Sequence, residues 1–153
     1  MLLKFLKDKE YPATVDTFAE LLVQVFGANK QNLRVVLPGF AALDLLFSND
    51  AFAPLQNFET MLKLLALVEA EIAKTKDAKK LLAAISVFCG FLSFEGEVRG
   101  RALSVIMGLL ASAFPKVRKE TAQQLYISLL ALEGVVSEEN QQEAESLLVD
   151  TQW

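Results

Sequence analysis

The chain has 153 residues, of which 53% are hydrophobic, and a formal net charge of −4 at pH 7. This length allows one domain with a sizeable core. The chain has no histidine and a single cysteine, Cys89, which argues against a zinc site and excludes an internal disulfide. Residues 120–153 hold seven acids and no base, a balance that argues against a nucleic-acid-binding module.

The apolar stretches of the chain do not predict a membrane span. The two longest, Leu81–Phe94 and Ala102–Phe114, contain serine and glycine and are shorter than a bilayer requires. The apolar start, Met1–Leu6, is followed at once by charged residues and shows no signal-peptide core or cleavage site. We therefore expect a soluble cytoplasmic protein that has no contact with membranes or nucleic acid.

The N-terminal segment Met1–Lys7 has too little apolar pattern to form a helix alone and resembles the end of a preceding helix. Pro12 then breaks the chain, and Thr14 can cap the first complete helix. This helix is expected to run to about Phe26, where Gly27 stops it. Its apolar residues recur at a spacing of three to four, at Val15, Phe18, Leu22, Val25 and Phe26.

The second expected helix is Leu33–Phe47, and Asn32 can cap it. Pro38 lies beyond its first turn, where proline removes a hydrogen bond and kinks the axis. The loop Ser48–Asn57 leads to a third helix, at about Phe58–Lys74. The predicted core positions of this third helix are Met61, Leu64, Leu65, Val68 and Ile72.

Four more helices are expected, at about 77–92, 96–113, 115–132 and 137–149. Asp77 and Ser137 can cap the first and the last of them. Pro115 suits the first position of the third, because its missing N–H has no partner there in any helix. Cys89 falls inside the apolar pattern of residues 77–92, where a free cysteine is expected to be buried and inert.

The starts of these helices show a period. Phe58, Asp77, Gly96 and Pro115 follow one another at intervals of nineteen residues. Two such intervals make a helix pair close in length to HEAT and armadillo repeats, which have roughly 40 residues. No alternating strand pattern occurs. The sequence therefore predicts an all-α fold, an α-solenoid of antiparallel helix pairs (HEAT/armadillo-like), with residues 1–153 as a single helical-repeat domain.

No pattern in the chain indicates catalysis. The chain has no glycine-rich phosphate loop and no nucleophile elbow. Glu69 and Glu71 lie two residues apart on a helix and do not share a face. Glu95 and Glu97 precede or open a helix, where acids suit the helix dipole. We expect a protein that is not an enzyme and that has no cofactor, metal site or catalytic residue.

Two arginines and three polar residues are the candidate functional positions. On a helical wheel Arg99 and Arg118 fall within the apolar arcs of their helices, each after a valine in the first turn. A cation there opposes the helix dipole, so each arginine needs a partner, either an acid or the carbonyl end of a neighbouring helix. We expect both to be structural contacts between repeats. Lys116, Lys119 and Gln123 point outward and are the candidate partner-binding residues.

The helix at 115–132 also carries a second apolar strip, formed by Tyr126, Ile127 and Leu130. The last helix can cover this strip with Leu147, Leu148 and Trp153. If it does not, the strip is an exposed patch and a candidate binding site.

Three segments carry a resemblance to a known family: KLLALVEAEIAKTKDAKKLLAAISVFCGFLSFEGEVRGRAL, FPKVRKETAQQLYISLL and the closing LLVDTQW. Together they resemble the C-terminal domain of the tubulin-folding cofactor D family over about Phe58–Trp153. The first fifty residues fit more loosely, mainly through RVVLPGFAALDLLF. The family is a much longer HEAT-rich solenoid, so the resemblance implies that the chain is a C-terminal fragment of such a protein.

The resemblance also implies a function. The family holds β-tubulin, works with tubulin-folding cofactors C and E and an Arf-like small GTPase, and assembles or dismantles the αβ-tubulin heterodimer. It implies a cytoplasmic, cytoskeleton-associated chaperone that takes part in GTPase activation within a complex, with tubulin as an acidic partner. The period alone leaves a second hypothesis open, a general HEAT-type interaction scaffold that is not specific for tubulin.

Overall fold

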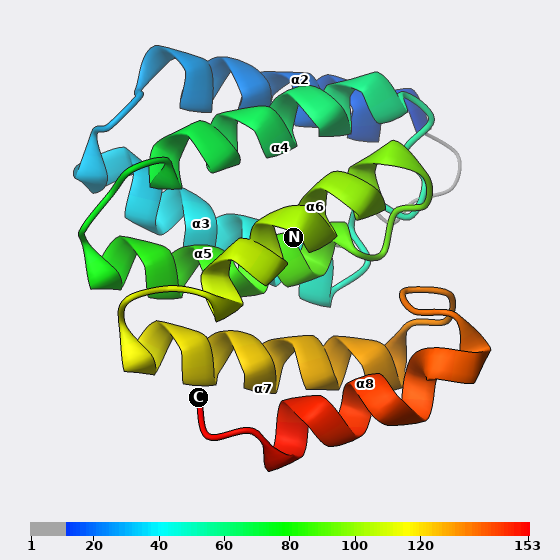
Figure 1. The fold of residues 1–153 in the computed structure, drawn as a ribbon. Helices are drawn as coiled ribbons and strands as arrows, with labels where there is room; N and C mark the ends of the chain where they lie inside the picture. Colours follow the sequence, from blue (N-terminus) through cyan, green and yellow to red (C-terminus); the bar gives the residue numbers. More distant parts are fainter. Residues whose placement is uncertain (1–11) are drawn as a thin grey trace. The chain divides into compact units, whose positions relative to one another are not determined.

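The computed structural model describes residues 12–153, and this part of the chain contains seven helices and no strand (Figure 1). The prediction of an all-α fold is therefore confirmed. The expected helix end at Met1–Lys7 lies outside the described residues. The chain divides into two compact units, Met1–Thr75 and Lys76–Trp153, and each is described by itself. That residues 1–153 form a single domain stays a prediction.

The first unit contains α2 (Pro12–Ala28), α3 (Leu33–Ser48) and α4 (Phe58–Ile72). The prediction that Thr14 caps α2 is wrong, because the helix already begins at Pro12, whose fixed φ suits a first turn. Gly27 does not end it either. Asn29 donates two hydrogen bonds to carbonyl groups at the end of the helix. Its Nδ2 donates to Val25 O at 2.8 Å, and its backbone N–H donates to Phe26 O at 3.3 Å. The helix can therefore continue to Ala28.

Helix α3 begins as predicted, because the side chain of Asn32 accepts a hydrogen bond from Arg34 N at 3.2 Å. Pro38 lies inside the helix. The rings of Phe26 and Phe40 stack with their centroids 6.0 Å apart and join α2 to α3. Gly39 makes room for this contact, since a Cβ built there would lie 2.7 Å from Cζ of Phe26.

Helix α4 lies beside α2 (Figure 1). Asp16 of α2 stabilises the start of α4. The Oδ1 atom of Asp16 accepts hydrogen bonds from the backbone N–H groups of Gln56 at 3.1 Å and Asn57 at 2.9 Å. The helix ends at Ile72 rather than at Lys74, since Lys74 has a φ of 60°, which a helix cannot contain. All five predicted core positions are buried: Met61, Leu64, Leu65, Val68 and Ile72.

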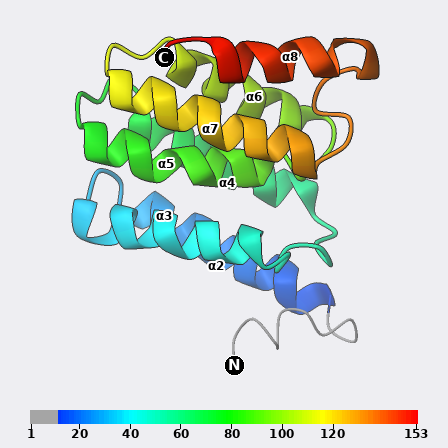
Figure 2. The same ribbon diagram turned by 90° about the horizontal axis from the view of Figure 1, so that it is seen from below.

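The second unit contains α5 (Ala78–Phe91), α6 (Glu97–Leu110), α7 (Pro115–Ala131) and α8 (Glu138–Asp150). Successive helices contact one another, and α5 also contacts α7. Figure 2 shows α7 between α5 and α8. Contacts between neighbours in the chain and between alternate helices are typical of stacked helix pairs. The all-helical unit is consistent with the expected solenoid, and a HEAT-like geometry of the stack stays a prediction.

The helix ends of this unit follow from short-range contacts. Asp77 caps α5 as predicted, because its Oδ1 accepts from the backbone N–H groups of Lys79 at 2.9 Å and Lys80 at 3.3 Å. Helix α6 ends at Leu110, earlier than the predicted Ala113. The residue before a proline avoids the helical region, and Phe114, which precedes Pro115, is extended. The chain must leave the helical conformation before it reaches that residue.

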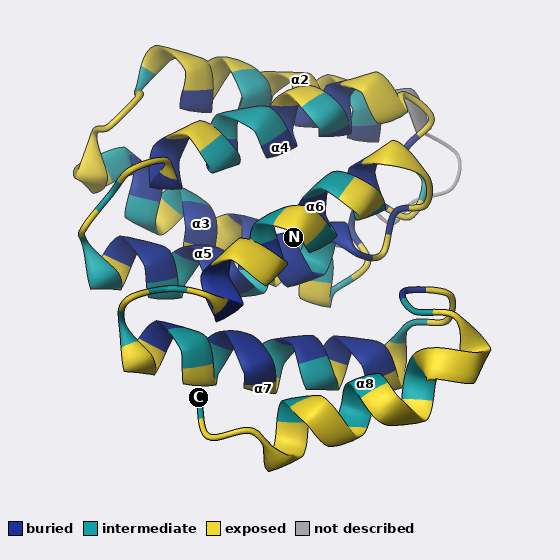
Figure 3. Ribbon diagram, viewed as in Figure 1, coloured by how far each residue is buried: buried dark blue, intermediate teal, exposed yellow. Residues whose placement is uncertain are grey.

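The burial pattern differs between α7 and α8 (Figure 3). Helix α7 has a continuous buried face, whereas α8 has no buried residue. Cys89 in α5 is 8% exposed, as expected for a cysteine that packs in an apolar helix.

Candidate interaction surface

Helix α7 contacts α5, α6 and α8, so its packing organises the second unit. Its buried face is formed by Val117, Thr121, Ala122, Leu125, Ser128 and Leu129. The two hydroxyl groups on this face donate hydrogen bonds within the helix. Thr121 Oγ1 donates to Val117 O at 2.7 Å, and Ser128 Oγ donates to Gln124 O at 3.0 Å. Within residues 12–153 no buried side-chain polar atom lacks a hydrogen-bond partner. This face therefore packs against neighbouring helices with its polar groups satisfied.

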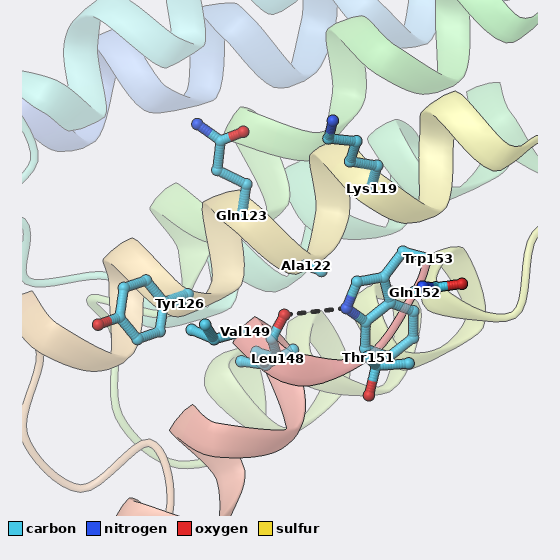
Figure 4. A pocket seen from close by; sticks show the side chains of 9 residues that line it. All are labelled: Lys119, Ala122, Gln123, Tyr126, Leu148, Val149, Thr151, Gln152 and Trp153. Atoms are coloured by element: carbon cyan, nitrogen blue, oxygen red, sulfur yellow. Dashed lines mark hydrogen bonds between the residues drawn. The ribbon is translucent and has the colours of Figure 1, made fainter.

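The opposite face of α7 carries the candidate partner-binding residues. Lys116, Lys119 and Gln123 are all exposed, in agreement with their outward positions on the helical wheel. Among the described residues, none of these three side chains has a hydrogen bond or an ion pair. Figure 4 shows Lys119 and Gln123 leaving α7 on the same side, with their polar groups pointing away from Leu148 and Val149. Their role in binding a partner stays a prediction.

A pocket of about 440 Å³ lies between α7 and the C-terminal segment (Figure 4). Most of its lining is apolar, and Lys119 is its one charged lining residue. Helix α7 contributes Lys119, Ala122, Gln123 and Tyr126, and the end of the chain contributes Leu148, Val149, Thr151, Gln152 and Trp153. The sequence indicates that Lys119 and Gln123 lie on an open face, but no local pattern in it indicates this pocket.

Two hydrogen bonds position the C-terminal segment that forms one side of the pocket. Gln141 Nε2 donates to Leu129 O at 3.1 Å, which ties the start of α8 to the end of α7. Trp153 Nε1 donates to Leu148 O at 2.9 Å, which holds the indole ring against the end of α8. The half-buried ring therefore forms a wall whose position is set by the chain itself.

Helix α8 leaves two of the three residues of the apolar strip of α7 uncovered, so for these two the second alternative holds and they form an exposed apolar patch. Ile127 is 49% exposed and Leu130 is 60% exposed. Leu147, one of the expected covering residues, is itself 58% exposed. Helix α8 contacts α7, and Gln141 Nε2 of α8 donates to the backbone carbonyl of Leu129 in α7. Tyr126, by contrast, is half-buried and lines the pocket with Leu148 and Trp153.

Arg99 joins the ends of two other helices. Its Nε donates to Leu92 O at 2.9 Å and to Phe94 O at 3.0 Å, where α5 ends. Its Nη1 donates to Glu133 O at 3.1 Å and to Gly134 O at 3.0 Å, just beyond α7. Carbonyl groups at helix C-termini carry partial negative charge, so the guanidinium is well placed between them. Gly134 has a φ of 69°, and a Cβ built there would lie 3.3 Å from Nη1 of Arg99.

Arg118 repeats part of this pattern nineteen residues later. Its Nη1 donates to Ser112 O at 2.8 Å, just beyond the end of α6. Each arginine thus lies in the first turn of a helix and contacts carbonyl groups at the end of the helix before it. Carbonyl ends were one of the two kinds of partner expected from the sequence. A role for both arginines as repeat-to-repeat contacts stays a prediction.

The comparison with known families identifies the chain. The family described as tubulin folding cofactor D C terminal matches residues 1–80, which is more than half of the chain. The chain belongs to this family. No solved structure matches it.

Membership of the tubulin-folding cofactor D family confirms the resemblance seen in the sequence, although the matched ranges differ. The resemblance is strongest over about Phe58–Trp153, whereas the family match spans residues 1–80. The two ranges overlap in α4 and at the start of α5. The candidate surface on α7 lies outside the matched range, so the family assigns no role to Lys116, Lys119 or Gln123.

The described residues also bear on two other kinds of site. Among residues 12–153, no helix has the length and apolar character needed to cross a membrane. The same part of the chain holds no cluster of three or more histidine, cysteine, aspartate or glutamate side chains suited to a metal ion. The family membership itself indicates a role like that of tubulin-folding cofactor D.

Proposed function

We propose that this chain is a module of a tubulin-folding chaperone of the cofactor D type. In this role it helps to hold β-tubulin and to assemble or dismantle the αβ-tubulin heterodimer, together with tubulin-folding cofactors C and E and an Arf-like small GTPase. The module has no catalytic activity of its own and acts in the cytoplasm at the cytoskeleton. The observation that carries the proposal is the family match over residues 1–80.

The charge on α7 supports a contact with an acidic partner. Lys116 and Lys119 are exposed and have no partner among the described residues. Exposed charges of this kind act mainly through the rate of association with a partner of opposite charge. Tubulin is such a partner under this proposal, and the two lysines would then attract it before close contact forms.

A double charge reversal tests this contact. We expect Lys116→Glu/Lys119→Glu, made in the full-length cofactor, to slow capture of β-tubulin about five- to tenfold at low salt, with a smaller effect at high salt. Lys76→Glu/Lys79→Glu is the matched control, because it makes the same change in charge at two exposed lysines just before and within α5. Capture at the wild-type rate by the α7 variant would mean that this face of α7 is only hydrated.

A general helical scaffold without specificity for tubulin is the second candidate. The stacked helices of the second unit favour it, because such stacks bind large surfaces of many partners. A pull-down from cytosol with the full-length protein separates the two. Recovery of β-tubulin and an Arf-like GTPase supports the chaperone module, and recovery of other proteins without either supports the general scaffold.

A further inference from the structure

The pocket between α7 and the C-terminal segment has the composition of a site for an anchoring side chain. Its volume of about 440 Å³ falls within the range of ligand pockets, which is roughly 300–1,000 Å³. Its apolar wall is formed by Ala122, Tyr126, Leu148, Val149 and Trp153. The hydrogen bond from Trp153 Nε1 to Leu148 O holds the largest of these side chains in place. The wall is therefore formed before a ligand arrives, which lowers the cost of binding.

The charge around the pocket differs from that of the chain. The chain has a net charge of −4, and all seven charged residues of the segment 120–153 are acids. None of these acids lines the pocket, and Lys119 does. Lys116 lies three residues before Lys119 on the same exposed face of α7. Neither lysine has a hydrogen bond or ion pair among the described residues.

The polar groups at the rim suit a peptide backbone. Gln123 and Gln152 are lining residues at the rim, and the side-chain amide of neither has a hydrogen bond within the described part of the chain. An amide both donates and accepts, so each can bond the backbone of an extended segment. A wholly apolar ligand would leave both lysines and both amides unused.

We propose that this pocket binds an acidic peptide segment of a partner protein, with one apolar side chain inserted between Tyr126 and Trp153. Acidic residues that flank the inserted side chain bind Lys119 and Lys116 at the rim. The apolar anchor provides the binding energy, and the lysines select for the acidic flanks. The inference does not rest on the proposed function, since the pocket can bind such a segment from any partner.

Trp153 is the only tryptophan in the chain and it lines the pocket, so its fluorescence reports directly on occupancy. The test titrates the full chain with a blocked peptide, Glu-Glu-Phe-Glu-Glu, which contributes no tryptophan signal. We expect a saturable change in emission. Exchange of the central phenylalanine for serine, or of the four glutamates for lysine, should weaken the affinity at least about tenfold.

Two variants locate the binding. Lys119→Glu should weaken the affinity for Glu-Glu-Phe-Glu-Glu at least about threefold. Lys79→Glu makes the same charge change at an exposed position of α5 outside the pocket and should leave the affinity within about twofold. Circular dichroism confirms that both variants are folded.

The absence of a saturable change at millimolar peptide would overturn the proposal, as would equal affinity for the serine peptide or equal weakening by the two variants. Loss of β-tubulin capture has no bearing on it, since the peptide titration contains no tubulin. Conversely, peptide binding without tubulin capture refutes the proposed function alone.

Discussion

Arg99 is a charged residue whose loss should destabilise the second unit. We expect Arg99→Ala to remove four hydrogen bonds to carbonyl groups. The bonds to Leu92 and Phe94 are part-buried and their acceptors belong to buried residues, so water reaches these acceptors less freely than it reaches the surface. An unsatisfied buried acceptor costs about 1–3 kcal/mol. The acceptors on Glu133 and Gly134 belong to exposed residues and can bind water instead.

With about 1–2 kcal/mol for each buried acceptor and almost nothing for the exposed pair, the free energy of unfolding should fall by about 2–4 kcal/mol. In a chain of this size each kcal/mol lowers Tm by about 2–4 °C. Urea unfolding followed by the fluorescence of Trp153 measures the effect, because this tryptophan lies in the same unit as Arg99.

Three controls isolate the hydrogen bonds. Arg118→Ala removes a single bond, to Ser112 O, and should cost about 1 kcal/mol. Lys116→Ala removes an exposed charge without a partner and should leave stability unchanged or raise it by up to about 1 kcal/mol. Arg99→Lys keeps the charge but lacks the planar fork, so it should recover less than half of the loss. A loss below about 0.5 kcal/mol for Arg99→Ala would refute the reasoning.

Two further predictions concern packing. Gly39→Ala should cost about 1–3 kcal/mol, because the new methyl group meets the ring of Phe26 that stacks on Phe40, and Phe26→Leu should relieve part of this cost in the double variant. Urea unfolding of the single and double variants measures this, and additive effects would show that the two positions do not interact. Cys89 should resist a thiol reagent in the native chain and react after denaturation, since only 8% of it is exposed. Rapid native labelling would contradict its buried position.

Local signals predicted the helices well where a single side chain decides the boundary. Asn32 and Asp77 cap α3 and α5, because their side chains accept hydrogen bonds from the backbone N–H groups of the second or third residue of the helix. Such contacts depend on neighbouring residues alone and can be inferred from spacing. The end of α2 could not be inferred in this way. Asn29 donates hydrogen bonds to the last carbonyl groups of the helix, which continues through Gly27. A glycine ends a helix where the backbone turns left-handed, and Gly27 does not have a positive φ.

The candidate site was predictable in part for a similar reason. Helical phase places Lys119 and Gln123 outward and Arg99 inward, so their exposure follows from the sequence. The pocket depends on how the end of the chain returns toward α7, which the hydrogen bond of Trp153 helps to determine. Likewise, the carbonyl of Gly134 lies 35 residues after Arg99, and no local pattern predicts a contact across that distance.

The cations at the start of α7 make opposite contributions to folding. A positive charge in the first turn of a helix opposes the dipole and costs about 0.3–1 kcal/mol when exposed. Arg118 offsets this cost through its hydrogen bond to Ser112 O. Lys116 lies in the same turn and has no partner within residues 12–153, so nothing there offsets its cost. Lys116 therefore contributes no contact to the fold within the described residues, and its role in binding stays a proposal.

Stability is therefore a second readout for the charge-reversed variant of α7. Glutamate at position 116 suits the helix dipole, so Lys116→Glu/Lys119→Glu should be at least as stable as the wild type while it captures its acidic partner more slowly. A variant that loses stability together with binding would show that the lysines support the fold. Unchanged or increased stability together with slower capture would assign them to the interface.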